Sequence, residues 1–166
     1  AIQAALNKAT AALDQQWATT PEKTRPFLVS RDGGDADKGK VLFNTHLGAQ
    51  CIRCHKVGKE GSDVGPNLLG IAASKDRDYL LQSVIAPSKD IDKKYQTQSF
   101  LMDSGQIVMG LVKSESEDET VISDSQGKEI RLSNDEIEDV SKNEVSIMPD
   151  MTDVLTRKEV RDVVAY

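Results

Sequence analysis

Apolar residues recur at helical spacing near the start of the chain. Steps of three or four residues join Leu6, Ala9, Leu13 and Trp17, which predicts a helix over residues 1–20. Trp17 is the only tryptophan, and we expect it to pack against the rest of the protein.

Two further helices are expected in the first half of the chain. Asp35 is a candidate N-cap for a helix over about residues 36–46, and Ser74 for a helix over about residues 75–86. Both segments carry apolar residues on one face.

The last segment predicts another helix, over about residues 157–166. Thr156 and Glu159 have the spacing of a capping box, and the valines that follow form an apolar stripe.

Between these helices apolar and polar residues alternate along the chain, and this two-residue period is typical of β-strands. Turn sequences rich in Asp, Ser and Gly separate the alternating runs. We therefore predict a small antiparallel sheet inserted at about residues 95–140, in which Met102 and Met109 are expected to be core residues. The predicted strands are 95–102, 106–113, 120–124 and 128–132.

Residues 21–34 contain two prolines and two glycines among charged residues. This composition is typical of a linker. We therefore divide the chain into an N-terminal helix and linker, 1–33, and a main domain, 34–166.

Composition excludes several classes of protein. A net charge of −6 and a pI of about 5.0 argue against a nucleic-acid partner, and no apolar run is long enough for a transmembrane segment. Aromatic residues make up only 4% of the chain, so a buried prosthetic group would supply missing apolar bulk. The start at Ala1 indicates a mature chain or a segment of a longer protein.

The candidate chemistry lies in the run Cys51-Ile52-Arg53-Cys54-His55. Two thiols on one helical turn can each add to a vinyl group of a haem, and the histidine that follows can bind the iron. This is the attachment sequence of c-type haem.

The same cysteine spacing also occurs in zinc sites and redox dithiols. A zinc site would need two more Cys or His ligands, and the only other histidine is His46. A redox dithiol would follow a strand in a βαβ unit, which is not predicted here. The sequence therefore favours one covalent haem, with His46 expected at a helix end and as a lesser candidate for a second iron ligand.

The second axial ligand decides between an electron carrier and a ligand-binding haem protein, because a six-coordinate iron binds oxygen or peroxide poorly. Met148 lies in a loop that Pro149 stiffens, and it is the favoured candidate, followed by Met151.

Taken together, these motifs resemble a class I cytochrome c. More narrowly, residues 34–166 resemble the haem-binding cytochrome c domain typical of planctomycetes and verrucomicrobia. The segments that carry the resemblance are Gly39 with Phe43, Cys51–His55, Gly65-Pro66-Asn67-Leu68, Met148-Pro149 and the valine-rich end at Tyr166.

This resemblance implies roles for individual residues. Cys51 and Cys54 form the thioethers, His55 is the proximal ligand and donates to the Pro66 carbonyl, and Met148 is the distal ligand. Met148 lies 93 positions after His55, and the inserted sheet accounts for this long separation. Further residues implied at the haem are Phe43, Val64, Leu68, Ile71 and Ile147.

We therefore expect a mainly helical protein with an inserted sheet and an N-terminal helical extension. The expected function is one-electron transfer outside the cytoplasm, without catalysis by this chain, as the electron-acceptor module of a larger periplasmic oxidoreductase system. The expected partner is a redox protein or a fused dehydrogenase domain, and the strands of the insertion offer a surface for dimerisation. The alternative is a haem peroxidase or a gas or redox sensor with a labile sixth ligand.

Overall fold

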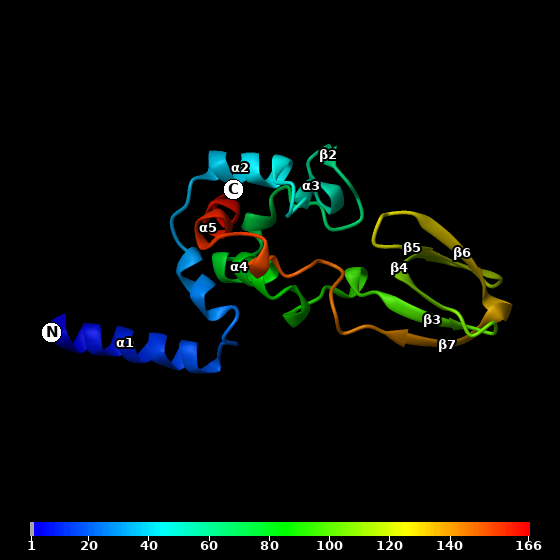
Figure 1. Ribbon diagram of the computed structural model, residues 1–166, viewed down its shortest axis with the longest axis horizontal. Helices are drawn as coiled ribbons and strands as arrows, with labels where there is room; N and C mark the ends of the chain where they lie inside the picture. Colours follow the sequence, from blue (N-terminus) through cyan, green and yellow to red (C-terminus); the bar gives the residue numbers. More distant parts are fainter. Residues whose placement is uncertain (1) are drawn as a thin grey trace.

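The helices gather in one part of the molecule and the strands of the larger sheet in another (Figure 1). The computed structural model describes residues 2–166, without the side chains of residues 6, 9, 10, 13, 14, 16 and 17. The predicted stripe of Leu6, Ala9, Leu13 and Trp17 lies outside these described side chains. The expectation of a mainly helical fold is wrong, because 41% of the chain is helical and 22% lies in strands, with one five-stranded antiparallel sheet.

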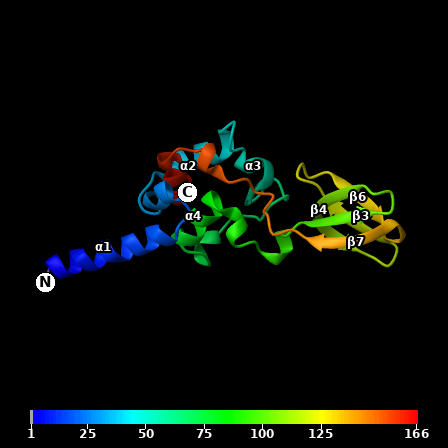
Figure 2. The same ribbon diagram turned by 60° about the horizontal axis from the view of Figure 1, so that its bottom comes forward.

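The N-terminal helix α1 (Ile2–Thr19) confirms the helix expected over residues 1–20. It projects away from the other elements in both ribbon views (Figure 1 and Figure 2). The segment after it was predicted to be a linker, but it forms the short 3₁₀ helix η1 (Arg25–Ser30). Phe27 of η1 is buried in the helical core, and the Ser30 hydroxyl donates to the Arg157 carbonyl over 2.7 Å. The division at residues 33 and 34 stays a prediction.

Two helices contribute to the helical core, α4 (Arg77–Ile85) and α5 (Arg157–Ala165), and a third, α2 (Ala36–Thr45), packs against α5. Asp35 caps α2 as predicted, but Asp76 caps α4 in place of Ser74. The capping box before α5 is confirmed. The buried members of this core are Phe27, Ala49, Leu81, Ile85, Met151, Leu155, Val160 and Val164.

Helices α2 and α5 cross at Gly39. A Cβ atom at this position would overlap the carbonyl of Asp162 and would lie 2.8 Å from the Tyr166 Cβ. Beside the crossing, the buried Asp162 carboxylate accepts the backbone N–H of Asp35 over 2.9 Å. The Phe43 and Tyr166 rings pack at 5.7 Å between centroids. Glycine is therefore what allows the two backbones to approach so closely.

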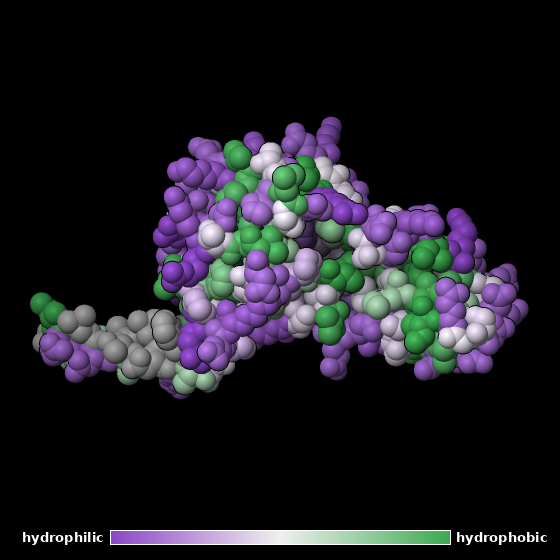
Figure 3. Space-filling view, in the orientation of Figure 1, coloured by the Kyte–Doolittle hydropathy of each residue, from purple (hydrophilic) through white to green (hydrophobic). Residues whose placement is uncertain are grey.

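The sheet has the strand order β6-β5-β4-β3-β7, with every neighbouring pair antiparallel. Its own core is separate from the helical core and consists of Phe100, Met102, Ile122 and Leu132. Hydrophobic surface is also visible over the sheet in Figure 3. The strands are β3 (Gln98–Met102), β4 (Ile107–Glu115), β5 (Glu119–Ser123), β6 (Glu129–Ser133) and β7 (Ile137–Lys142). The first four match predicted strands, whereas β7 was not predicted.

The chain enters and leaves the sheet through neighbouring strands. Gln98 pairs with Lys142, and the Asn143 N–H donates to the buried Thr97 carbonyl over 2.9 Å. The two ends of the inserted segment therefore lie side by side.

Short elements connect these parts. They are α3 (Cys51–Cys54), the hairpin β1 (Lys56–Val57) and β2 (Glu60–Gly61), and the 3₁₀ turns η2 (Ile71–Ala73), η3 (Pro87–Lys89), η4 (Lys93–Tyr95), η5 (Asn134–Glu136) and η6 (Met151–Asp153).

Candidate haem-binding site

The cysteine motif forms a single helical turn, α3. Gln50 precedes it in the left-handed conformation, with φ of 47°, and the His55 N–H closes the turn on the Cys51 carbonyl over 2.8 Å. Both thiols are free and half-buried, and Cys51 packs against the helical core. Burial raises the pKa of the Cys51 thiol. The turn therefore carries two reduced thiols side by side and leads directly to His55.

The His55 ring is held by the loop that follows it. Its Nδ1 lies 3.1 Å from the Pro66 carbonyl oxygen, and because a carbonyl only accepts, Nδ1 carries the proton and donates. Burial lowers the pKa of His55, and the contact with Pro66 partly opposes that change. The neutral ring keeps its lone pair on Nε2, which is the form that binds a metal ion.

Two glycines let the loop lie against His55. A Cβ at Gly65 would be 3.0 Å from both Cε1 and Nδ1 of the ring, and one at Gly61 would overlap the His55 carbonyl. The Gly65 N–H donates to the Cys54 carbonyl over 2.7 Å. In the sequence Gly65 was named only as part of the segment Gly65-Pro66-Asn67-Leu68 that carries the resemblance, and its contact with the His55 ring was not predicted. The Gly-Pro pair is the local signal that would have indicated it.

His46 closes the turn that leads into the motif. Its Nδ1 accepts the backbone N–H of Gly48 over 3.2 Å and of Ala49 over 3.0 Å. Its Nε2 faces Glu159 of α5, 4.0 Å from Oε1. These contacts favour a structural role for His46 over that of a second iron ligand.

Replacing His46 with alanine is expected to lower the free energy of unfolding by about 1 kcal/mol, because two backbone N–H groups lose their acceptor. Thermal unfolding followed by circular dichroism measures this effect. His46→Asn keeps an acceptor and should lose less. Both variants should keep the parent haem spectrum, and a spectral change in both would contradict the structural role.

The residues expected at the haem lie in different surroundings. Val64 is buried, whereas Leu68, Ile71 and Ile147 are half-buried apolar residues of the loops and of η2. Phe43 is buried against Tyr166 at the helix crossing. Half-buried apolar side chains keep part of their surface available to an apolar group.

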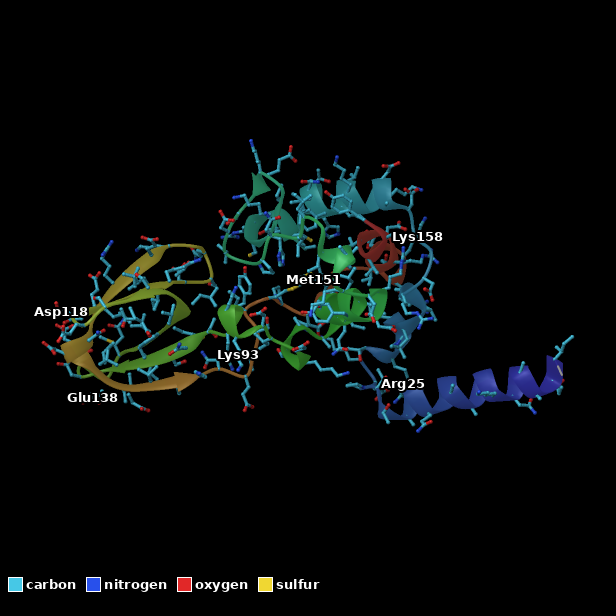
Figure 4. All side chains as sticks on the ribbon, turned by 180° about the vertical axis from the view of Figure 1, so that it is seen from behind. Arg25, Lys93, Asp118, Glu138, Met151 and Lys158 are labelled. Carbon is cyan, nitrogen blue, oxygen red and sulfur yellow. The ribbon has the colours of Figure 1, made fainter. Side chains whose placement is uncertain are left out.

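The four methionines occupy distinct environments. Met102 is buried in the sheet core, as predicted, but Met109 is 53% exposed, so its prediction as a core residue is wrong. Met151 is buried in the helical core, and Figure 4 shows it within the helical part. Met148 is half-buried in the loop before α5, where its N–H donates to the Ser146 hydroxyl over 3.1 Å.

The donor set fits a c-type haem. Two free thiols share one turn, and the neighbouring imidazole presents an unused Nε2 while its Nδ1 is fixed. A loop thioether is also present in Met148.

The sequence profile of the cytochrome c family matches residues 36–142. The chain belongs to the cytochrome c family. The matched range includes Cys51, Cys54 and His55, as well as the five strands of the sheet. It ends before Met148, so the match says nothing of the distal ligand. No curated protein matched the chain.

Membership of the cytochrome c family implies a covalently bound haem c with iron, and with it haem-based electron transfer. Cytochrome c domains are generally extracytoplasmic. Within residues 2–166, none of the helices combines the length and the apolar character that a membrane span requires.

Proposed function

We propose that this cytochrome c is a one-electron carrier in which His55 and Met148 are the axial ligands. The observation that carries this proposal is the 3.1 Å contact from His55 Nδ1 to the Pro66 carbonyl, directly beside the two thiols of α3. It orients a neutral imidazole with Nε2 available. When bound, the haem iron would supply the one-electron ferric–ferrous couple.

Cys51 and Cys54 would hold the group covalently. Each thiol would add across a vinyl group, so that a sulfur–carbon bond would form and the thiol hydrogen would pass to the neighbouring carbon. The addition needs reduced sulfur and no external oxidant. Both cysteines lie on the single turn α3 and are half-buried, which supports this role.

Met148 is the methionine best suited to the distal position. Met102 and Met151 are buried in the sheet and helical cores, and Met109 is mostly exposed on β4. Met148 alone combines a loop position with partial burial. A thioether disfavours the ferric state and raises the reduction potential, as suits an electron carrier.

The apolar residues near the motif would limit water at the group. Val64 is buried, and Leu68, Ile71 and Ile147 are half-buried. Exclusion of water lowers the local dielectric and disfavours the extra charge of the ferric form.

We further propose that the carrier works in the periplasm, as a domain of the type found in planctomycetes and verrucomicrobia. It would accept electrons from a redox protein or a fused dehydrogenase domain. The outward projection of α1 is consistent with an N-terminal extension that precedes a domain at residues 34–166 (Figure 1). The edge strand β7, whose residues are mostly exposed, supports a dimer formed through the sheet.

Maturation in a host that attaches haem c tests the function. We expect the chain to gain the mass of one haem, with a six-coordinate low-spin ferric spectrum and a weak methionine–iron charge-transfer band. A bare polypeptide mass would contradict haem attachment. A high-spin spectrum that shifts at once on adding carbon monoxide or cyanide would instead support a peroxidase or sensor.

Replacing Cys54 with serine is expected to leave one thioether. The unreacted vinyl group stays conjugated with the macrocycle, so the reduced absorption bands should move to longer wavelength than in the parent protein. Absorption spectra of the two reduced proteins measure the shift. Ser104→Ala, which removes a hydroxyl in the turn between β3 and β4, should leave the bands in place.

A further inference from the structure

The inserted sheet reaches the haem-binding segment at the loop of residues 62–66. The turn between β5 and β6 brings Gly127 so close to this loop that a Cβ there would lie 2.8 Å from Val64 Cγ2. The Lys113 ammonium of β4 donates to the Asp63 carbonyl over 3.4 Å. Figure 1 shows this turn, in yellow, on the side of the sheet that faces the loop after α3.

The same loop positions the His55 ring. Val64 is buried and directly precedes Gly65, whose N–H bonds the Cys54 carbonyl and whose Cα carries no side chain where the His55 ring lies. Pro66 then supplies the carbonyl that accepts from Nδ1. Val64 is therefore only two residues from Pro66, so a displacement of Val64 changes the hydrogen bond between the Pro66 carbonyl and His55 Nδ1.

We propose that the sheet acts as a support for the proximal ligand: Gly127 and Lys113 hold residues 62–66 where the Pro66 carbonyl meets His55. The proposal rests on the proposed role of His55 as an axial ligand. A hydrogen bond to the outer nitrogen of a ligating histidine fixes the ring and raises its basicity. Gly127 and Lys113 are thus positioning residues that act through the loop on the electron affinity of the iron.

The test replaces Gly127 with alanine in the haem-loaded protein. The new Cβ pushes Val64 and lengthens the contact between Pro66 and His55. In the ferrous protein we expect the His55 Nδ1 proton to exchange with solvent about tenfold faster than in the parent protein, which is the effect of losing one hydrogen bond. Nuclear magnetic resonance measures this exchange rate. The midpoint potential should rise, because a less basic imidazole stabilises the ferric state less.

Gly105 offers a matched control. It lies in the turn between β3 and β4 with φ of +79°, against +80° for Gly127, but a Cβ there would have nothing within 4 Å. Gly105→Ala therefore imposes the same backbone strain without the contact. It should leave both the exchange rate and the potential unchanged.

A double-mutant cycle separates the contact from general damage to the sheet. Val64→Ala removes the Cγ2 atom, so adding Gly127→Ala to it should cause little further change. Equal effects of Gly127→Ala and Gly105→Ala, or an undiminished effect in the Val64→Ala protein, would overturn the proposal.

Lys113→Met provides the same test without strain in a turn. It removes the donor to Asp63 and keeps the aliphatic stem, and it should speed exchange in the same direction as Gly127→Ala. An unchanged rate would count against the support by Lys113. Failure of the proposed function would give a different result. If His55 does not bind iron, the unmodified protein lacks the nuclear magnetic resonance signals of an iron-bound histidine. If those signals are present but the effects of Gly127→Ala and Val64→Ala simply add, only the support by the sheet is refuted.

Discussion

Met148→Ala is expected to open the sixth coordination position of the haem iron. The methionine–iron charge-transfer band should vanish, and the ferrous protein should bind carbon monoxide at once. The reason is that Met102 and Met151 are buried in the two cores and Met109 lies on β4, so none of them replaces Met148. The potential should fall by on the order of a tenth of a volt, within the roughly 0.8 V that axial ligands span. Absorption spectra with and without carbon monoxide, and a redox titration, measure these effects.

Met109 provides the control for this substitution. It is 53% exposed on β4, and Met109→Ala should keep the parent spectrum. An unchanged spectrum in Met148→Ala would remove Met148 from the distal position. A lost charge-transfer band in Met151→Ala alone would transfer the role to Met151.

Gly39→Ala is expected to destabilise the protein by about 3 kcal/mol, although alanine favours a helix over glycine by about 1 kcal/mol. The added Cβ has no room, because it would overlap the Asp162 carbonyl and press on Tyr166. The midpoint of thermal unfolding, followed by the helical circular dichroism signal, should fall by roughly 6–12 °C.

Lys40→Ala is the control on the same helix. Lys40 is exposed, and its replacement should move the midpoint of unfolding little. If Gly39→Ala raised the midpoint instead, helix propensity would outweigh the clash, and the close crossing of α2 and α5 would not govern stability.

Features set by neighbouring residues were predicted best from the sequence. The turn of Cys51–His55, the Asp35 cap and the capping box before α5 each depend on contacts within a few residues. The strands β3 to β6 were predicted because their apolar residues alternate. Local chemistry was therefore enough for these elements.

Features set by distant contacts were predicted poorly. Strand β7 is polar and exposed, since it pairs only with β3 at the edge of the sheet, and so it carries no alternating pattern. The alternation of apolar and polar residues also does not show which face of β4 is buried, and Met109 lies on its solvent-exposed face. Phe27 lies in a 3₁₀ turn that is too short to show a hydrophobic period, yet it joins the helical core.

The fold class was wrong for a related reason. The resemblance to a class I cytochrome c gave weight to the helices around the motif, whereas the insertion brings a sheet with a core of its own. At the site, the approach of Gly127 to Val64 joins residues far apart in the sequence, and only the folded chain brings them together.

The hydrogen bond between Thr97 and Asn143 has a consequence for comparing proteins of this kind. Since both ends of the insertion meet there, hairpins can lengthen or shorten across evolution without displacing the loop that carries Met148. The number of residues between the cysteine motif and the methionine is then a poor indicator of homology. A search that demands a fixed interval would overlook relatives whose haem pockets are alike.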